Sequence, residues 1–397
     1  MFLVADPRGC AEAEGRRPVL ICFSHLRWNF VFQRPQHLMT RAAAGYRVIF
    51  FEEPEFAETS EPFLRKTESA EGVLVVTPML PSAVSDTDTN MAQQALLQEL
   101  LFQLDAPVSI AWFYTPLALG FAGNIRAKVI VYDCMDELSN FRGASDKLVP
   151  LERQLLEQAT VVFAGGASLY EAKRTLHRSV HLFRSSVDVD HFATARRGPA
   201  DMTEPDDQRG LSRPRIGFFG VIDERMDLQL VDALALSRPA WQFIMIGPTA
   251  KIDLASLPKR PNLHWLGLKT YQALPHYLAG WDAGFMPFAH NDATRFISPT
   301  KTPEFLAAGL PVVSTGIADV VRDWGIDGLV HVADDAAEMA ASIETMLATD
   351  RRPWLERVDA RLASLSWDAT WVAMERLLRL SMGQATPVQN AATAMAT

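Results

Sequence analysis

Two doubly wound α/β domains in tandem are predicted by three features of the 397-residue sequence. Short apolar runs of strand character alternate with helical segments, a polar stretch interrupts the alternation once, and the alternation then resumes. Alternation of this kind is typical of parallel βαβ units. The chain also exceeds the size at which one hydrophobic core usually stops growing, so two domains are expected.

The first set of runs defines a Rossmann-like N-terminal domain over residues 1–193. Each run is short and rich in β-branched or aromatic residues, as buried parallel strands are. The runs are VLICFS (19–24), RVIFFEE (47–53), VLVVTP (73–78), SIAWFY (109–114), VIVYDC (129–134) and TVVFAG (160–165).

Residues 194–214 are rich in charge, Pro and Gly and have no apolar period, which predicts a linker. A second domain is predicted over 215–363, and 364–382 form an amphipathic segment expected to be helical. Residues 383–397 are small and polar, as in a disordered tail. The runs of the second domain are RIGFFG (215–220), QFIMIGP (242–248), NLHWLG (262–267), AGFMPF (283–288), PVVST (311–315) and LVHVA (329–333).

The composition argues against several classes of protein. The net charge of −9 makes binding of nucleic acid through a general positive field unexpected. Cys10, Cys22 and Cys134 have neither CxxC nor Cys/His spacing, so we expect no disulfide framework and no metal site. The N-terminal residues lack the apolar core of a signal peptide, and no stretch reaches the roughly 18 apolar residues of a membrane span. We therefore expect a cytoplasmic protein.

A weaker expectation concerns the membrane surface. Arg27, Arg34, Arg41 and Arg47 follow one another closely in the first domain. If they shared one face, that face would attract anionic lipid at the inner side of the membrane. The overall negative charge argues against strong attachment, so only weak peripheral contact is predicted.

A lysine stands near the predicted start of a helix in SPTKTPEFLAAGLPVVST (298–315). Its Ser, Thr and Pro residues suit a helix N-terminus, so a short helix should begin between 298 and 303. The partial positive charge of such a terminus favours Glu304 and disfavours Lys301. Lys301 is therefore expected to face an anion, unless it is simply a solvated surface residue.

The segment RIGFFGVIDERMDLQLVDALAL (215–236) places Gly220 at a strand end and Arg225 in the turn that follows. A glycine there lets a ligand approach the backbone. Arg225 and Lys301 both follow strands of the second domain, and the turns after parallel strands open on one edge of the sheet. Two cations there would form a diphosphate site. Glu304 could then accept hydrogen bonds from ribose hydroxyls, or be only a favourable first-turn acid.

Together these segments resemble the nucleotide-sugar signature of retaining glycosyltransferases with the GT-B fold, the class related to bacterial cell-surface and exopolysaccharide enzymes. The resemblance continues through residues 262–288 and through SSVDVDHF (185–192). It implies two Rossmann-like domains that face each other across a cleft, with the acceptor in the first domain and the donor in the second. The helix at 364–382 would return to the first domain.

The resemblance also implies which residues hold the donor. Gly220 would lie at the phosphate turn, Arg225 and Lys301 would bind the diphosphate, and Glu304 would bind the ribose. Backbone groups from Leu266 to Lys269 would hold the base.

The donor segment departs from the family that it resembles at a position that matters for the donor sugar. Where many relatives carry a glutamate that contacts the donor sugar, this chain has Phe296. Ser298 or Thr300 would then substitute for that carboxylate. The reaction implied is metal-independent, needs no cofactor beyond the nucleotide-diphosphate-sugar itself, and proceeds with retention.

Two segments of the first domain are further candidates. FSHLRWNFVFQRPQHL (23–38) supplies His25, Trp28, Arg34 and His37 as acceptor-binding residues, although both histidines could be structural. VIVYDCMDELSNF (129–141) ends a strand with several carboxylates, which raise one another's pKa and could supply a base.

Within that second segment, Asp133 is the candidate for catalysis, beside Arg225 and Lys301. Asp136 is expected to cap the following helix.

The predicted function is transfer of a sugar from a nucleotide-diphosphate-sugar to a saccharide or lipid-linked acceptor in cell-surface or exopolysaccharide biosynthesis. Two alternatives stay open. A sugar-nucleotide epimerase of the same fold would act without an acceptor. A non-catalytic subunit of a polysaccharide-assembly complex would bind nucleotide without turnover.

Overall fold

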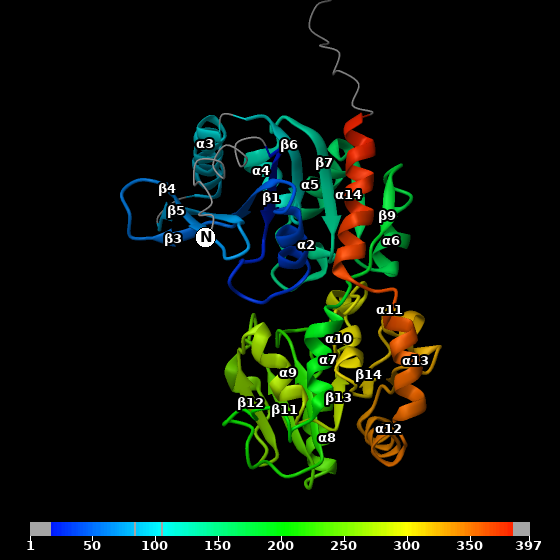
Figure 1. Cartoon of the computed structure of the whole chain (residues 1–397). Helices are drawn as coiled ribbons and strands as arrows, with labels where there is room; N and C mark the ends of the chain where they lie inside the picture. The colour runs from blue at the N-terminus through cyan, green and yellow to red at the C-terminus, as the bar shows by residue number, and fades with distance from the viewer. Residues whose placement is uncertain (1–16, 83–84, 105, 384–397) are drawn as a thin grey trace, which may run out of the picture.

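The computed structural model describes residues 17–82, 85–104 and 106–383 and shows two α/β domains stacked end to end (Figure 1). The predicted fold class is confirmed, and each predicted apolar run forms a strand within a few residues of its predicted bounds. The predicted tail lies outside the described residues except for Gly383, and Cys10 lies outside them as well.

The N-terminal domain is built on a nine-stranded sheet with the order β3-β5-β2-β1-β6-β7-β8-β9, and β4 pairs with β5. All its pairings are parallel except β4 with β5. The strands are β1 (Val19–Ser24), β2 (Arg47–Glu52), β3 (Glu55–Ala57), β4 (Phe63–Glu68), β5 (Leu74–Pro81), β6 (Val108–Phe113), β7 (Ala127–Cys134), β8 (Val161–Ala164) and β9 (Val180–Leu182).

Helices cover both faces of this sheet. Alternate residues of β1 enter opposite clusters: Ile21 and Phe23 pack on one face, and Leu20 and Cys22 on the other. The second of these faces is closed by α2 and by the C-terminal helix. The helices are α2 (Arg34–Ala42), α3 (Asp86–Leu104), α4 (Leu119–Ala122), α5 (Leu148–Gln158), α6 (Ala167–Lys173) and α14 (Trp367–Gly383).

The C-terminal domain has a six-stranded parallel sheet with the order β12-β11-β10-β13-β14-β15. The order reverses between β10 and β13, and the edge of an open α/β sheet at such a reversal is where ligands bind. The strands are β10 (Arg215–Phe219), β11 (Gln242–Ile246), β12 (Leu263–Gly267), β13 (Ala283–Met286), β14 (Val312–Ser314) and β15 (His331–Val332). The helices are α7 (Val189–Ala193), α8 (Leu228–Ser237), α9 (Leu274–Leu278), α10 (Lys301–Ala307), α11 (Ala318–Val320), α12 (Ala336–Ala348) and α13 (Arg352–Leu362).

The chain passes between the domains twice. The first passage lies near 183–187, because Phe183 packs on the N-terminal core and Val187 belongs to the C-terminal one. The second lies near 362–367, where Leu362 is in the C-terminal core and Trp367 in the N-terminal core. Figure 1 shows α14 running back along the N-terminal domain.

The first passage corrects the predicted linker. Residues 194–214 do not connect the domains, because α7 before them already packs against α10 of the second domain. Gln208, inside this segment, is fully buried and hydrogen-bonds Tyr277 O (3.1 Å) and the indole Nε1 of Trp281 (2.7 Å). The polar composition of residues 194–214 predicted a flexible connection. Gln208 instead pairs with Tyr277 and Trp281, which are 69 and 73 positions away in the sequence.

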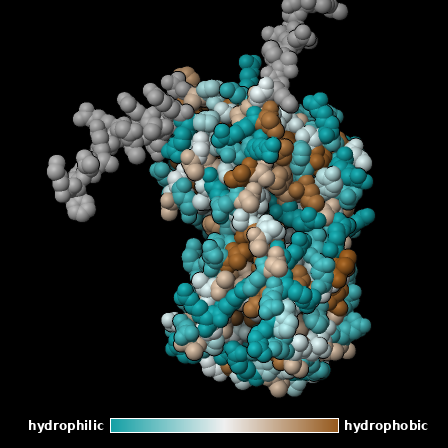
Figure 2. Space-filling view, turned by 45° about the vertical axis from the view of Figure 1, so that its right-hand side comes forward, coloured by the Kyte–Doolittle hydropathy of each residue, from teal (hydrophilic) through white to brown (hydrophobic). Residues whose placement is uncertain are grey.

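The structure does not support a basic face formed by the four arginines. Arg34 is fully buried, Arg41 pairs with Asp368 (2.7 Å), and Arg27 pairs with Glu52 (3.2 Å). None of the described helices is long and apolar enough to cross a membrane. The surface in Figure 2 is mostly hydrophilic, with apolar residues scattered in small groups.

Candidate active site

Two glycines shape the edge of the C-terminal sheet at the point where its strand order reverses. Gly220 follows β10 with φ of 141°, and Gly247 follows β11 with φ of 145°. A Cβ on Gly247 would overlap the carbonyl oxygen of Gly220, and a Cβ on Gly220 would overlap Cε of Lys301. Other residues rarely adopt these φ values. The glycines therefore allow the Lys301 side chain to lie directly over the backbone.

Lys301 and Glu304 occupy the first turn of α10, which begins at Lys301 within the predicted interval. Glu304 is only 8% exposed. Burial raises the pKa of Glu304 to about 8, with the Lys301 charge opposing the rise. Burial also lowers the pKa of Lys301, opposed chiefly by Glu304 and reinforced by the charge on Arg225. Lys301 and Glu304 thus form a buried pair in which the charge of each group opposes the effect of burial on the pKa of the other.

Arg225 reaches the same edge from the β10–α8 turn. Its guanidinium is held by Asp223, with Nε to Oδ1 at 2.9 Å and Nη2 to Oδ2 at 2.7 Å. The guanidinium carbon lies 5.3 Å from the ring centroid of Phe141, a residue of the N-terminal domain. Asp223 and Phe141 therefore fix a second cation at the boundary between the domains.

Asp136 faces this corner from the N-terminal domain. Burial raises its pKa to about 6, while the charges of Arg225 and Lys301 lower it, so its carboxylate lies near both cations. It was expected to cap a helix, but the 3₁₀ turn that follows has Glu137 at its N-cap and no side-chain cap. Its position directly after β7 was the available signal for a functional role.

The prediction of Asp133 as a catalytic residue requires correction. Asp133 and Arg34 have no exposed side-chain surface and form a buried ion pair, with Nη2 to Oδ1 at 2.8 Å. Arg34 also donates to Phe183 O at 2.8 Å. Neither side chain can touch a substrate, so Arg34 is not an acceptor-binding residue and Asp133 is not a base.

The other predicted acceptor residues are mostly structural. His37 is stacked on Trp367 with centroids 4.6 Å apart, and burial lowers its pKa to about 3. Trp28 is 7% exposed and packs edge-on against Phe50. His25 is only partly buried; burial, and then the charge on Lys251, lower its pKa to about 4. Of these residues, Trp28 also lines the cavity between the domains, and His25 lies near Lys251 of the C-terminal domain.

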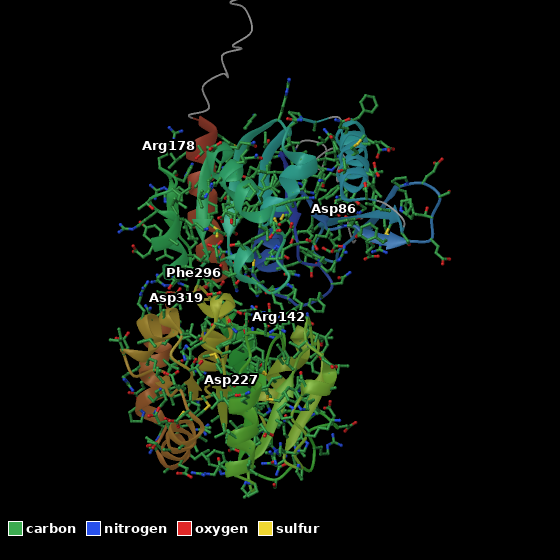
Figure 3. The ribbon with its side chains drawn as sticks, turned by 180° about the vertical axis from the view of Figure 1, so that it is seen from behind. Asp86, Arg142, Arg178, Asp227, Phe296 and Asp319 are labelled. Atoms are coloured by element: carbon green, nitrogen blue, oxygen red, sulfur yellow. The ribbon has the colours of Figure 1, made fainter. Side chains whose placement is uncertain are left out.

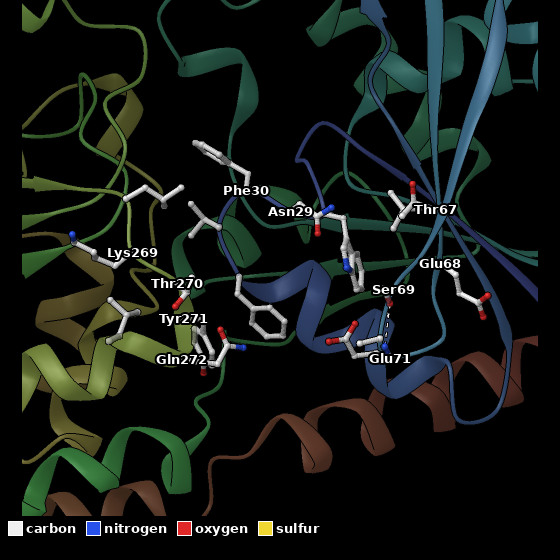
Figure 4. A pocket seen from close by; sticks show the side chains of 17 residues that line it. Asn29, Phe30, Thr67, Glu68, Ser69, Glu71, Lys269, Thr270, Tyr271 and Gln272 are labelled. Carbon is white, nitrogen blue, oxygen red and sulfur yellow. Dashed lines mark hydrogen bonds between the residues drawn. The ribbon is translucent and has the colours of Figure 1, made fainter. Parts of the chain in front are cut away.

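The predicted base-binding segment lines a cavity of about 620 Å³ between the domains. Figure 4 shows Lys269, Thr270 and Tyr271 on one side, with Asn29 and Phe30 opposite. Lys269 lines the cavity, and its ammonium is paired with Asp207 (2.5 Å). Leu266 is partly buried against the C-terminal core.

Ser298 and Phe296 form part of the contact between the domains. A Cβ on Gly166 of the N-terminal domain would lie 2.7 Å from Cβ of Ser298. Phe296 packs on the N-terminal core, under the Arg295 guanidinium at 5.2 Å. Phe296 therefore anchors one domain to the other. Thr300 is the N-cap of α10 and makes no side-chain cap bond.

Other hydrogen bonds join the two domains. The Asp319 carboxylate accepts from the N–H (3.0 Å) and hydroxyl (2.5 Å) of Ser168. The Arg142 N–H donates to Glu224 at 3.0 Å. Figure 3 shows Arg142, Phe296 and Asp319 where the domains meet. Among the described residues, no group of His, Cys, Asp and Glu is arranged to hold a metal ion.

Comparison with known proteins identifies a family match and a curated relative. Residues 213–349 match the family model described as glycosyl transferases group 1. A Bacillus subtilis (strain 168) protein provisionally named as a teichuronic acid biosynthesis glycosyltransferase, TuaH, is 28% identical over 204 residues. That match covers 47% of this chain and 50% of the relative, so the similarity spans only about half the length of the curated relative.

Solved structures of similar shape cover nearly the whole chain. Sucrose-phosphate synthase from Thermosynechococcus elongatus has a TM-score of 0.68 at 14% identity, with 93% of this chain and 100% of that chain covered. An E. coli structure titled trehalose-6-phosphate bound with UDP-2-fluoro glucose has a TM-score of 0.67 at 13% identity (91% and 98% covered). Anabaena HepE in complex with UDP has a TM-score of 0.60 at 14% identity (91% and 100% covered). The fold of this chain is GT-B.

Proposed function

We propose that this chain, with its GT-B fold and its match to glycosyl transferases group 1 over residues 213–349, transfers a sugar from a nucleotide-diphosphate-sugar to a saccharide or lipid-linked acceptor. The observation that carries the proposal is that Lys301 lies over the backbone of Gly220 and that Lys301 and Arg225 both act on the carboxylate of Asp136. Cell-surface polysaccharide is the proposed product class, because the relative TuaH is named for teichuronic acid biosynthesis.

The proposed chemistry uses the two cations in place of a metal. Cleavage of the sugar–phosphate bond leaves negative charge on the departing diphosphate, and fixed positive groups stabilise that charge best where water is excluded. Asp223 holds the Arg225 guanidinium in place before the reaction. Contacts such as Ser168 with Asp319 close the cleft around the donor. Transfer with retention is proposed from the resemblance of the donor segments.

A turnover assay tests the proposal and separates it from its alternatives. The full chain is incubated with UDP-glucose, GDP-mannose or ADP-glucose, with and without a mixture of neutral oligosaccharides and polyprenyl-phosphate-linked sugars. Nucleotide release and the products are followed by NMR. We expect a new glycosidic bond that forms only with acceptor and keeps the donor's anomeric configuration. A modified sugar nucleotide formed without acceptor would indicate an epimerase, and nucleotide binding without any product would indicate a non-catalytic subunit.

The proposed ribose contact of Glu304 predicts a pH dependence. Only the ionised carboxylate accepts hydrogen bonds from both ribose hydroxyls, and burial raises its pKa to about 8. Below that pH, nucleotide binding must first release the proton, so affinity should rise with pH by up to about tenfold per unit. We therefore expect the affinity of the parent to increase between pH 6 and 8 relative to that of Glu304→Gln, measured by calorimetry with UDP, GDP or ADP. If the affinities of the two proteins changed with pH in the same way, Glu304 would not be a ribose contact.

A further inference from the structure

A second cavity, of about 320 Å³, lies in the N-terminal domain at the carboxyl ends of β1, β2 and β6. Ser24, Glu53 and Thr115 line it where these strands end. The strand order reverses between β1 and β6, so this cavity lies where an open α/β sheet usually binds a ligand. None of the residues predicted from sequence to bind the acceptor lines it.

Helix α3 supplies one wall of the cavity with polar side chains. Asp86, Thr89, Asn90 and Gln93 follow a helical spacing and all line the cavity. Further along the same helix, the buried residues are leucines that pack on the domain core: Leu96, Leu97, Leu100 and Leu104. Packing alone would favour apolar residues along the whole buried face. The change from amide and hydroxyl groups to leucine therefore marks where the helix leaves the cavity.

Gln93 has a carboxamide oxygen with no hydrogen-bond partner among the described residues, although its side chain is only 3% exposed. A buried unpaired acceptor costs about 1–3 kcal/mol, so such atoms usually have a role. Asn90 lies beside it, and Gly120 makes room for Asn90, since a Cβ there would lie 2.9 Å from the Asn90 amide nitrogen. Two amide side chains are thus directed to one space.

Another part of the lining is aromatic. Phe121 packs against Phe23 (5.8 Å) and Phe51 (5.4 Å), and all three rings line the cavity. Amide groups beside an aromatic wall match a sugar ring, which presents hydroxyls at its edge and C–H groups on its face. The volume is near the lower end for ligand pockets, which suits one or two sugar residues.

The charges of the lining disfavour an anionic ligand. Glu52, Glu53 and Asp86 supply three carboxylates against one ammonium, that of Lys147. Lys147 is already paired with Asp86 at 3.0 Å. Asp86, labelled in Figure 3, is exposed at the rim. Glu52 is paired with Arg27 at 3.2 Å, so a phosphate or uronate group inside would be repelled chiefly by Glu53, which makes no ion pair among the described residues.

The lining of the cavity is linked to the donor corner through Glu53, His25 and Lys251. Ser24 and Glu53 line the cavity, and His25 follows Ser24 directly. His25 and Glu53 both lie near the ammonium of Lys251, a residue of the C-terminal domain. Lys251 in turn lies over the Phe141 ring at 5.5 Å, the ring that also contacts Arg225. A ligand in the cavity would therefore extend toward the diphosphate site.

We infer that this cavity binds an uncharged sugar residue of the acceptor, with Asn90 and Gln93 as its specificity-determining residues. The identification of that sugar as an acceptor rests on the proposed function. Binding of an uncharged sugar to the cavity does not depend on it.

Saturation-transfer NMR on the full chain tests the inference with methyl α-glucoside, N-acetylglucosamine and glucuronic acid as probes, with and without UDP, GDP or ADP. We expect signals from at least one neutral probe and none from glucuronic acid. Gln93→Leu should weaken binding of the neutral probe by about tenfold, as expected for the loss of one or two hydrogen bonds. Gln98→Leu, an exposed position on the same helix, is the matched control and should bind normally.

A stability measurement separates a binding role of Gln93 from a structural one. Because Gln93→Leu replaces a buried carboxamide with an unpaired oxygen by an apolar side chain, its thermal midpoint should stay equal to that of the parent or rise. Lower stability with unchanged probe binding would show that Gln93 is structural and would overturn the inference. Absence of binding by both neutral probes, or equal binding by Gln93→Leu, would also overturn it. Nucleotide binding and turnover without sugar binding here would leave the proposed function intact.

Discussion

Lys301→Ala is expected to weaken binding of a nucleoside diphosphate by about 10- to 150-fold, equivalent to about 1.5–3 kcal/mol, the range for a hydrogen bond to a charged group. The Lys301 side chain lies over the backbone of Gly220, where a diphosphate would meet both this ammonium and Arg225. Removal of the ammonium also leaves Glu304 buried without its counter-charge. Calorimetric titration of UDP, GDP and ADP into both proteins, with no metal added, gives the affinities.

Two further variants define what Lys301 contributes. Lys301→Met keeps an aliphatic stem and removes the charge, so it should lose as much affinity as Lys301→Ala if charge is the cause. Lys259→Ala removes an exposed lysine of the same domain and should bind like the parent. If Lys301→Ala binds every nucleotide as tightly as the parent does, the diphosphate is not at this corner and the transferase proposal loses its main support.

Asp133→Ala is expected to lower the free energy of unfolding by about 3–5 kcal/mol, because it leaves the Arg34 guanidinium buried and unpaired. Both side chains are completely buried, and three contacts of 2.8–3.1 Å join them. Phe183 O alone cannot compensate a full charge. Chemical denaturation followed by tryptophan fluorescence measures the loss.

The partner substitution distinguishes the ion pair from simple packing. If the cost of Asp133→Ala comes from an orphaned charge, the double variant Arg34→Met with Asp133→Leu should recover most of the stability, since apolar pairs of similar volume often replace buried ion pairs at little cost. Asp368→Ala breaks the exposed pair with Arg41 and should cost less than about 1 kcal/mol. A double variant no more stable than Asp133→Ala would contradict this account.

Much of the fold could be predicted from sequence, because buried parallel strands are continuous apolar runs. The same holds for the donor corner: Gly220, Arg225 and Lys301 each follow a strand, and parallel strands bring such turns to one edge. The strands that were missed lack an apolar run. β4 is mostly exposed along its length, and β3 and β9 are each three residues long.

The acceptor side was predicted less well for a physical reason. The sequence of 23–38 contains suitable side chains, but only tertiary contacts show that Arg34 turns inward to Asp133, 99 positions away, and that His37 stacks on Trp367. The polar face of α3 could have been found from its spacing. That signal is weak, because Asn and Gln on a helix are usually solvated.

The two passages of the chain between the domains, near 183–187 and 362–367, have a mechanical consequence. Two covalent connections define a line, so the domains can swing about that line far more easily than they can twist across it. The stacked rings of His37 and Trp367 involve residues of the second passage and can persist throughout such a swing. The bonds between Arg142 and Glu224 and between Ser168 and Asp319 must break. Opening of the domains for exchange of ligands would also have to separate Phe296 from the N-terminal core, so the two passages act as a hinge that several contacts hold closed.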